Sequence, residues 1–161
     1  MEDESSLFSE ILPNLYMGGT GDSDIVQFGK RLPQLHEREE FDSVVTCYSY
    51  AQPMSWYVHE NRYGFADGPM DAETFVKVQE LATWLHAEWR LGKKCLSRCQ
   101  AGLNRSGLVV ALVLMLEGCS ADEAIALIRE KRDPNALFNL HFVRKLQELQ
   151  TTQASHRGEV A

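Results

Sequence analysis

The chain has 161 residues, of which 44% are hydrophobic and 24% are charged, and its formal net charge is −7. This length suits one domain with a substantial core. The negative balance disfavours nucleic acid as a partner, because binding to phosphate backbones depends on many Lys and Arg contacts. The opening sequence MEDESSLFSE lacks the basic and apolar regions of a secretory signal, and the longest strongly apolar run, Leu108 to Leu116, is about half the length that a bilayer requires. We therefore expect a cytoplasmic protein without a membrane partner.

The N-terminal half alternates between strand and helix patterns. Residues 14–19 form a short predicted strand that ends at glycines, and residues 23–40 carry apolar side chains at helical spacing, although Pro33 must bend or split that helix. The β-branched run from Ser43 to Tyr48 predicts a buried strand, and a weaker strand is expected near Glu60 to Phe65.

The C-terminal half continues the alternation. A helix is predicted from about Asp71 to Leu91, with Gly92 at the position of a C-cap glycine, and a short strand over residues 93–98 follows. An apolar helix is expected over residues 107–117. Two more helices are predicted, one opened by a capping box at Ser120–Glu123 and running to about Lys131, and a last amphipathic one after Pro134.

This order of elements predicts a single α/β domain over residues 7–150, with residues 1–6 and 151–161 as flexible termini. Its centre is expected to be a mainly parallel, twisted sheet of about four or five strands flanked by helices. Ligands of such sheets collect at the carboxyl ends of the strands. Functional residues should therefore lie in the loops that follow the strands.

One of these loops, Ser97-Arg98-Cys99-Gln100-Ala101-Gly102-Leu103-Asn104-Arg105-Ser106-Gly107, carries a specific pattern. A Cys followed by Gly at the third position, Arg at the sixth and Ser or Thr at the seventh is expected by chance only about 0.002 times in a chain of this composition. A buried core cysteine in an ordinary turn has no need of Gly, Arg and Ser at these offsets.

The chemistry of anion binding explains the spacing. Five residues between Cys99 and Arg105 can curl so that their backbone N–H groups point inward around the sulfur, and Gly102 permits the turn. The following helix directs its N-terminus at the same point, and the guanidinium of Arg105 can hold two phosphate oxygens at once. An ordinary thiol is only ~3% thiolate at pH 7, so the loop must also stabilise the Cys99 anion. The pattern predicts a nucleophilic cysteine in a phosphate-binding loop.

Cys-Gln-Ala-Gly-Leu-Asn-Arg-Ser-Gly resembles the signature loop of the protein tyrosine phosphatases, in particular the small dual-specificity-like branch. The segment Ile11-Leu12-Pro13-Asn14-Leu15-Tyr16-Met17-Gly18 is similar to the first strand of that branch, and Ala66-Asp67-Gly68-Pro69 stands where the family carries its general acid. The resemblance covers most of the chain. It implies a phosphatase that hydrolyses phosphotyrosine, with phosphoserine and phosphothreonine as additional substrates.

The resemblance also assigns roles. Cys99 is the implied nucleophile that forms a thiophosphate, Arg105 the phosphate ligand and Asp67 the general acid and base. Substrate phosphate, or another oxyanion, is expected on the loop residues Gln100, Ala101, Gly102, Leu103, Asn104, Arg105 and Ser106. The Ser106 hydroxyl is similar to the family hydroxyl that stabilises the departing thiolate, and Asn104 is expected to hydrogen-bond within the loop.

Three assignments have open alternatives. Asp67 lies in an Asp-Gly pair that also suits an ordinary turn, and Asp71 is a rival acid that more naturally caps the following helix. Asn139 stands where some relatives place a polar residue near the pocket, but it could equally be a helix N-cap. Arg98 replaces the histidine that usually precedes the family's nucleophile, and it could stabilise the thiolate by charge or reach solvent.

The remaining cysteines predict no metal site, because neither they nor the five histidines are spaced as zinc ligands, and the implied mechanism needs no cofactor. Cys47 ends the predicted strand over residues 43–48. Some relatives form a protective disulfide from the corresponding position, so the resemblance raises the hypothesis of a reversible Cys47–Cys99 bond. Cys95 lies roughly 13 Å from Cys99 along its strand and could not bridge to it.

Other functions compete with protein dephosphorylation. Phosphoinositide phosphatases of the superfamily tend to carry lysines within this loop, whereas Gln100, Ala101, Leu103 and Asn104 are uncharged. Removal of RNA 5′-phosphates finds no support in the acidic composition. A phosphopeptide-binding pseudophosphatase would usually have lost the cysteine, the arginine or the acid. A rhodanese-like sulfur transferase and a P-loop nucleotide-binding protein do not match the motif.

Overall fold

The computed structural model describes residues 7–20 and 41–160, with side chains through residue 153. The helix predicted over residues 23–40 and the predicted loose end at residues 1–6 lie outside the described residues. Over the part of the chain that the structure describes, no helix is both long and apolar enough to cross a membrane.

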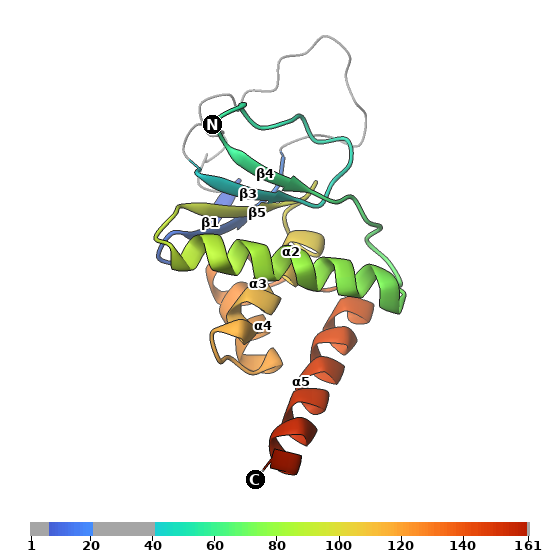
Figure 1. Cartoon of the computed structure of the whole chain (residues 1–161). Coiled ribbons are helices and arrows are strands. Elements are labelled where there is room, and N and C mark those ends of the chain that lie inside the picture. The colour runs from blue at the N-terminus through green and yellow to red at the C-terminus, as the bar shows by residue number, and fades with distance from the viewer. Residues whose placement is uncertain (1–6, 21–40, 161) are drawn as a thin grey trace.

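A five-stranded sheet of order β1-β2-β5-β3-β4 forms one layer of the domain (Figure 1). Its strands are β1 (Phe8–Leu12), β2 (Leu15–Gly18), β3 (Ser43–Thr46), β4 (His59–Arg62) and β5 (Cys95–Arg98). β1 pairs antiparallel with β2, and the other neighbours pair in parallel. Thr46 of β3 and Gly18 of β2 both pair with Arg98 of β5, so these strands end together. The predicted mainly parallel α/β sheet is confirmed.

One strand of this sheet was not predicted. β1 and β2 form a hairpin whose turn passes through Pro13 and Asn14, and Asn14 adopts a φ of 69°. Asn tolerates this left-handed conformation better than most residues, which suits it to the turn. The resulting antiparallel pair places β1 at the edge of the sheet.

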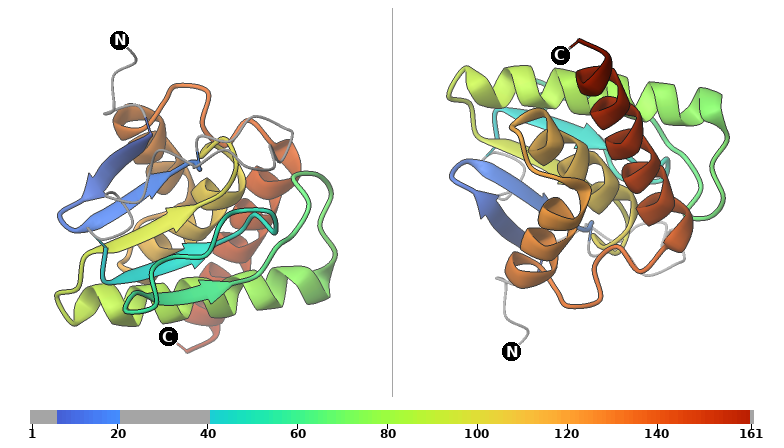
Figure 2. Two further views of the ribbon diagram at one scale, coloured as in Figure 1. Left: turned by 90° about the horizontal axis from the view of Figure 1, so that it is seen from above. Right: turned by 90° about the horizontal axis from the view of Figure 1, so that it is seen from below.

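Four described helices cover one face of the sheet (Figures 1 and 2). They are α2 (Ala72–Arg90), α3 (Arg105–Leu116), α4 (Ala121–Lys131) and α5 (Leu140–Val160). α3 lies in the middle of this layer and packs against α2, α4 and α5. The opposite face of the sheet is crossed by the connection between β3 and β4.

The predicted helix boundaries hold at several termini. The carboxylate of Asp71 caps α2 by accepting a hydrogen bond from Thr74 N at 2.8 Å, and Gly92 follows α2 with a φ of 86°. Ser120 and Glu123 form the capping box of α4. These caps satisfy backbone groups that a helix end would otherwise leave without partners.

Two boundaries differ from the prediction. α3 begins at Arg105, so the signature arginine itself belongs to the first helical turn. α5 continues to Val160, so helical backbone extends beyond residue 150, where the predicted domain ended. The hydroxyls of Thr151 and Thr152 donate to the carbonyls of Gln147 and Glu148, four residues earlier in the helix.

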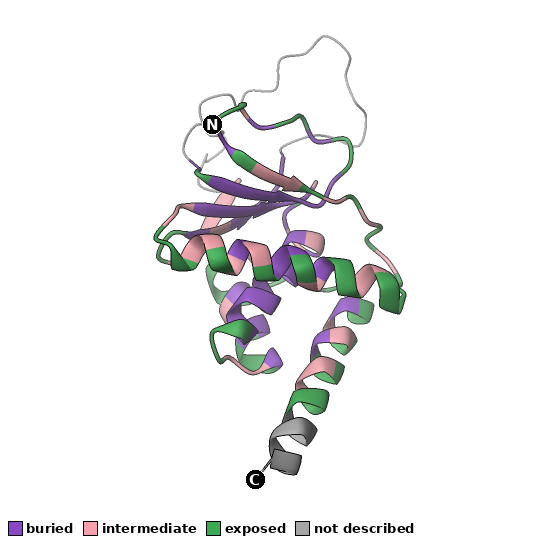
Figure 3. Ribbon diagram, in the orientation of Figure 1, coloured by how far each residue is buried: buried purple, intermediate pink, exposed green. Residues whose placement is uncertain are grey.

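The core lies between the sheet and α3. All residues of β3 and β5 are buried, as is every residue of α3 from Ser106 to Met115 (Figure 3). A smaller cluster on the opposite face joins Phe41, Val44, Met54, Val58 and Leu96 under the β3–β4 connection. Because β3 and β5 are buried on both faces, the loops that follow them start from well-fixed positions.

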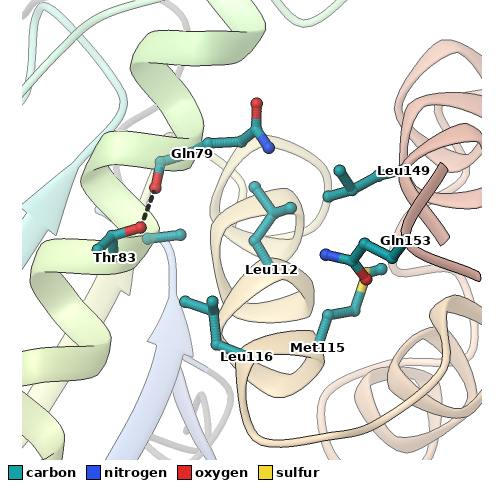
Figure 4. Close-up of a pocket in the computed structure, with 8 residues that line it drawn as sticks. Gln79, Thr83, Leu112, Met115, Leu116, Leu149 and Gln153 are labelled. Atoms are coloured by element: carbon teal, nitrogen blue, oxygen red, sulfur yellow. Dashed lines mark hydrogen bonds between the residues drawn. The ribbon is translucent and has the colours of Figure 1, made fainter. Parts of the chain in front are cut away.

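A small cavity of about 60 Å³ remains within the helical layer. It lies between α2, α3 and α5 (Figure 4), and its lining consists of Gln79, Ala82, Thr83, Leu112, Met115, Leu116, Leu149 and Gln153. The α3 residues of this lining belong to the C-terminal half of the helix. Leu112 is roughly two turns from Arg105, so the cavity is separate from the signature loop.

Candidate active site

Three connections meet at the carboxyl edge of the parallel strands. They follow β5 (residues 99–104), β3 (residues 47–58) and β4 (residues 63–71). In Figure 1 the arrows of β3, β4 and β5 point toward this common edge. Every sequence-predicted site residue except Asn139 lies in these connections, in the last residue of β5 or in the first turn of α3. The topology alone therefore brings most of the candidate site together.

The Cys99 side chain lies at the floor of the loop that follows β5. Only 2% of the residue is exposed, and its backbone N–H donates to Gly18 O at 3.1 Å. The N–H of Gly102 donates to Cys99 Sγ at 3.2 Å, and Ser106 Oγ lies 3.4 Å from the same sulfur. A backbone N–H group and a hydroxyl thus contact the sulfur, as an anion-stabilising loop requires.

Gly102 is required by the tightness of this loop. Its φ is 75°, and a Cβ at this position would lie 2.4 Å from both Gly18 C and Gly19 N. Any side chain would therefore force the loop away from the end of β2 and move the N–H group that contacts Cys99. The sequence argument for Gly102 was conformational, and the close approach of β2 adds a second, steric reason.

The outer residues of the loop are tied down by neighbouring segments. Gln100 O accepts from Thr20 N at 3.1 Å, and Leu103 O accepts from Leu137 N at 3.1 Å. Arg132, at the end of α4, donates to Gly102 O at 3.1 Å and to Ala101 O at 3.5 Å. Burial lowers the pKa of the Arg132 guanidinium, and negative charge on Cys99 opposes this shift.

Arg132 was missed by the sequence argument. It also donates to Ser9 Oγ of β1 at 3.2 Å, so one side chain joins α4, the signature loop and the edge of the sheet. Its only signal in the sequence is an arginine at a helix C-terminus, which is a common arrangement.

Arg105 lies at the mouth of the loop, and one nitrogen of its guanidinium already donates a hydrogen bond within the protein. Its Nη1 donates to Phe65 O at 3.3 Å, and its guanidinium carbon lies 5.5 Å from the centre of the Tyr48 ring. Nε of Arg105 is buried without a hydrogen-bond partner among the described residues. A buried donor without a partner is costly, so this position favours an acceptor supplied by a ligand.

Both Asp67 oxygens accept hydrogen bonds from amide side chains. Asn104 Nδ2 donates to Asp67 Oδ2 at 3.0 Å, and Asn139 Nδ2 donates to Asp67 Oδ1 at 2.7 Å. Asn104 directly precedes Arg105 in the signature loop. The structure therefore places the carboxyl group of Asp67 beside the loop that carries Cys99.

The hydrogen bonds of Asn104 and Asn139 show how far the predicted roles of these two side chains hold. Asn104 stands at the N-cap of α3 but makes no side-chain capping bond. The prediction was a hydrogen bond within its own loop. The Asn104 side chain instead accepts from Asn139 N at 3.0 Å and donates to Asp67. Asn139 combines both of its alternatives, because its Oδ1 accepts from His141 N at 3.0 Å while its Nδ2 holds Asp67.

The uncapped N-terminus of α3 has a chemical consequence. A capping side chain would satisfy one of the free N–H groups of the first turn. With Asn104 turned toward Asp67, those groups and the helix dipole are left for an anion in the loop. Among the described residues, no group of three or more His, Cys, Asp or Glu side chains is arranged to hold a metal ion.

Comparison with known proteins agrees with this geometry. Residues 32–152 match the sequence model of the dual specificity phosphatase catalytic domain, which is more than half of the chain. The chain belongs to the dual specificity phosphatase family.

Two curated relatives illustrate the match. Dual specificity protein phosphatase 22 of Mus musculus is 31% identical over 144 residues, which cover 88% of this chain and 73% of the relative. A putative tyrosine phosphatase, 123R, of Invertebrate iridescent virus 6 is 26% identical over 140 residues, which cover 81% of this chain and 85% of the relative.

Solved structures share the fold. A mouse putative dual specificity phosphatase complexed with zinc tungstate superimposes with a TM-score of 0.73 at 26% identity, covering 96% of this chain and 94% of that one. DUSP15 superimposes with a TM-score of 0.71 at 25% identity, covering 90% and 88%. As a member of this family, the chain is a phosphatase, that is, a hydrolase of phosphoesters.

Arg98 sets this dual specificity phosphatase apart from relatives that carry histidine before the nucleophile. The residue is only 3% exposed, so the expectation that it could reach solvent is wrong. It is the last residue of β5, and successive residues of a strand point to opposite faces. Its Nη2 donates to Glu60 Oε2 at 3.0 Å and its Nε to Thr46 Oγ1 at 3.0 Å. Burial makes a partner necessary for the guanidinium, and Glu60 supplies it.

Cys47 and Cys99 directly follow the paired ends of β3 and β5. Thr46 pairs with Arg98, and Cys47 N donates to Arg98 O at 2.9 Å, so the ladder continues to the two cysteines. Neighbouring strands lie about 4.8 Å apart, within the Cα separation of about 4.4–6.8 Å that disulfides need. Both thiols are free and buried in the structure. Burial, reinforced by negative charge on Cys99, raises the pKa of Cys47 well above its ordinary value.

We expect peroxide to link these two cysteines. Peroxide would oxidise the Cys99 thiolate to a sulfenic acid, and the Cys47 thiol would then displace water to form the disulfide. Peptide mapping of peroxide-treated protein should recover a Cys47–Cys99 linked pair, and reductant should restore activity. Cys95→Ser is the matched control, because Cys95 is buried like Cys47 but stands at the start of β5, remote from Cys99. Absence of the linked pair in the wild type would contradict the hypothesis.

Proposed function

We propose that the chain dephosphorylates phosphotyrosine in cytoplasmic proteins, with phosphoserine or phosphothreonine as additional substrates, through a thiophosphate on Cys99. One observation carries the proposal: Asn104 holds Asp67 beside the loop that has Cys99 at its floor and Arg105 at its mouth. A nucleophile, a phosphate ligand and a proton donor are thus joined at one site. Family membership supports the reaction class, and the geometry supports the roles.

The first step forms the S–P bond. Cys99 thiolate attacks phosphorus while the P–O bond to the leaving group breaks, and protonated Asp67 delivers its proton to the departing oxygen. The phosphoryl oxygens are held by Arg105 and by backbone N–H groups of the loop. These donors are in place before the reaction, so little reorganisation accompanies the change of charge.

The second step releases phosphate. Asp67 carboxylate takes a proton from water, the water oxygen attacks phosphorus, and the S–P bond breaks to return the Cys99 thiolate. Ser106 Oγ, 3.4 Å from the sulfur, is positioned to donate a hydrogen bond to the thiolate as it leaves. The hydroxyl thereby stabilises the thiolate as the leaving group of this step.

The role of Asp67 is tested by the dependence on the leaving group. We expect Asp67→Asn to lower kcat for a phosphotyrosine peptide by about 10²–10³-fold, because its phenolate needs a proton. With p-nitrophenyl phosphate the loss should be less than roughly tenfold, since nitrophenolate leaves without protonation. Initial rates on both substrates measure the difference.

The chain offers a matched control for this test. Asp71 lies in the same connection and caps α2, and asparagine caps a helix about as well as aspartate. Asp71→Asn should therefore leave both rates unchanged. Equal losses on the two substrates in Asp67→Asn would mean that Asp67 only supports the loop, and the acid would have to be assigned elsewhere.

Two other functions remain distinguishable by experiment. Phosphoinositide or RNA 5′-phosphate hydrolysis would show as a higher kcat/KM on those substrates than on phosphopeptides. A phosphopeptide-binding pseudophosphatase would bind phosphotyrosine peptides without releasing phosphate. The retention of Cys99, Arg105 and Asp67 in one site favours turnover over binding alone.

A further inference from the structure

Three parallel strands contribute polar side chains to one network at the carboxyl edge of the sheet. Arg98 ends β5, Thr46 ends β3 and Arg62 ends β4, and Thr46 pairs with both arginines in the register of the strands. Arg98 Nε donates to Thr46 Oγ1 at 3.0 Å, and this hydroxyl donates to Glu60 Oε2 at 2.5 Å. Glu60 Oε2 also accepts from Arg98 Nη2 at 3.0 Å and from Arg62 Nη2 at 3.2 Å. We call these four residues the cross-strand network.

Two members of the cross-strand network bind the middle of the β3–β4 connection. Arg98 Nη2 donates to Gln52 O at 2.5 Å, and Glu60 Oε1 accepts from Met54 N at 3.2 Å. The side chain of Met54 belongs to the apolar cluster that this connection covers. The connection is therefore held to the sheet by polar bonds at its backbone and by apolar contacts at its side chains.

The start of the same connection carries a contact to Arg105. Arg62 Nη1 donates to Tyr48 O at 3.4 Å and to Ser49 O at 3.3 Å. The Tyr48 ring centre lies 5.5 Å from the guanidinium carbon of Arg105, and only 7% of Tyr48 is exposed. An aromatic face at this distance attracts a guanidinium, so Tyr48 helps to orient Arg105. The position of Tyr48 depends in turn on the network that holds its backbone.

The charges of the network compensate one another inside the protein. The side chain of Arg98 is 4% exposed and that of Glu60 is 15% exposed. Removing one partner of a buried ion pair is strongly destabilising, because the other charge is left without compensation. Burial acts to raise the pKa of Glu60, but the hydrogen bonds from Thr46, Met54 and the arginines outweigh it and hold the pKa below its ordinary value. Glu60 is therefore ionised at the pH of an ordinary assay.

From these contacts we propose that Arg98 and Glu60 are positioning residues for phosphate binding. Their side chains hold the β3–β4 connection, the connection places Tyr48, and Tyr48 keeps the Arg105 fork oriented for the phosphoryl oxygens. The inference rests on the proposed function, in which Arg105 is the phosphate ligand. It also gives a reason for arginine before the nucleophile. An imidazole has two nitrogens and could not serve the three partners that Arg98 binds.

Tungstate, a tetrahedral oxyanion, tests this role without turnover. Calorimetry measures its Kd with wild-type protein and with Glu60→Gln, which keeps the size of the side chain but removes the charge that pairs with Arg98. The Kd should rise about fivefold, the scale of one weakened contact between a guanidinium and an aromatic ring. Thermal unfolding shows whether each variant is folded at the temperature of the titration.

Glu88→Gln is the matched control. The Glu88 side chain is 12% exposed and pairs with Lys93 at 2.6 Å and with His59 at 3.8 Å, so its burial and its ion pairing are similar to those of Glu60. Lys93 precedes β5 and His59 begins β4, which places these pairs at the amino edge of the sheet. Glu88→Gln should leave the Kd of tungstate unchanged, whatever it costs in thermal stability.

A double-variant cycle shows whether the effect passes through Tyr48. Tyr48→Leu removes the aromatic face and should weaken tungstate binding by itself. Adding Glu60→Gln should then change the Kd less than about twofold, because the contact that Glu60 supports is already lost. If Glu60→Gln is unfolded, Arg98→Lys takes its place, since an ammonium keeps the charge but not the planar fork. Full additivity, an unchanged Kd in the folded single variant, or no tungstate binding by the wild type would overturn the inference.

Hydrolysis of p-nitrophenyl phosphate by the same variants separates this inference from the proposed function. If wild-type protein releases no phosphate but its tungstate binding depends on Glu60 through Tyr48, the positioning role stands and the hydrolytic function fails. If hydrolysis proceeds and the Kd of tungstate does not respond to Glu60→Gln, the function stands and the positioning role fails.

Discussion

Replacement of Cys99 by serine is expected to lower kcat for p-nitrophenyl phosphate by roughly 10⁴-fold or more, the scale found when an enzyme loses its nucleophile. The hydroxyl of serine is far less acidic than a thiol, so the contacts that stabilise a thiolate cannot generate an effective oxygen nucleophile in its place. The change is small in volume, and the loop N–H groups and Arg105 remain. Assays of phosphate release in EDTA, across pH 4 to 8, measure the loss without contribution from loosely bound metal.

Cys119→Ser provides the control for this experiment. The substitution is the same, cysteine to serine, but Cys119 lies beyond the C-terminal end of α3. It stands between Leu116, the last residue of α3, and the capping box of α4. Its kcat should equal that of the wild type, and thermal unfolding should show that both variants are folded. Residual turnover above about one tenth in Cys99→Ser would contradict the thiophosphate mechanism. Absence of turnover in folded wild-type protein would favour the binding module instead.

The central part of the fold could be predicted from local sequence. The run at Ser43–Thr46 has two adjacent β-branched valines and is buried throughout, as a strand covered on both faces is expected to be. The caps at Asp71 and Ser120 follow from side chains that bond within three residues. Because each signal is local, each survives without knowledge of the tertiary structure.

The first hairpin shows where local signals are insufficient. β1 reads FSEIL, and of its residues only Ile11 is fully buried while Glu10 is exposed. A half-exposed edge strand gives a weak hydrophobic pattern, and its pairing with β2 is decided by the Asn14 turn. The sequence signal for the helix beyond residue 150 is also weak, since the two threonines there, Thr151 and Thr152, are poor helix formers.

The residues proposed as reacting groups could be proposed from the sequence, but the residues that hold them could not. The Cys99-to-Arg105 spacing is a local constraint of one loop. The bond between Asn139 and Asp67, by contrast, joins residues 72 positions apart, and Arg132 reaches Ser9 across 123 positions. The partner of Arg98 depends on β4 lying beside β3, which no local pattern specifies. Supporting contacts of this kind become visible only when the chain is folded.

Arg105→Lys is expected to lower kcat by about 10²–10³-fold, or about 2.7–4 kcal/mol, the usual effect of removing one donor that stabilises the transition state. Lysine keeps the positive charge but offers a single point donor, whereas arginine holds two oxygens in a planar fork. Nε of Arg105 is buried without a partner, and Nη1 already binds Phe65 O, so the fork is oriented before substrate arrives. A lysine could reproduce neither the direction nor the number of these donors.

Steady-state rates with p-nitrophenyl phosphate, together with inhibition by inorganic phosphate, measure both consequences of Arg105→Lys. The inhibition constant of phosphate should rise along with the loss of kcat, because the same donors hold the ground-state anion. Arg90→Lys is the matched control, since Arg90 is exposed at the end of α2 and its ion pair with Glu117 at 3.5 Å is one that lysine can also make. A variant at Arg105 that kept wild-type kcat would show that charge alone suffices at this position, and the bidentate role of the guanidinium would then be wrong.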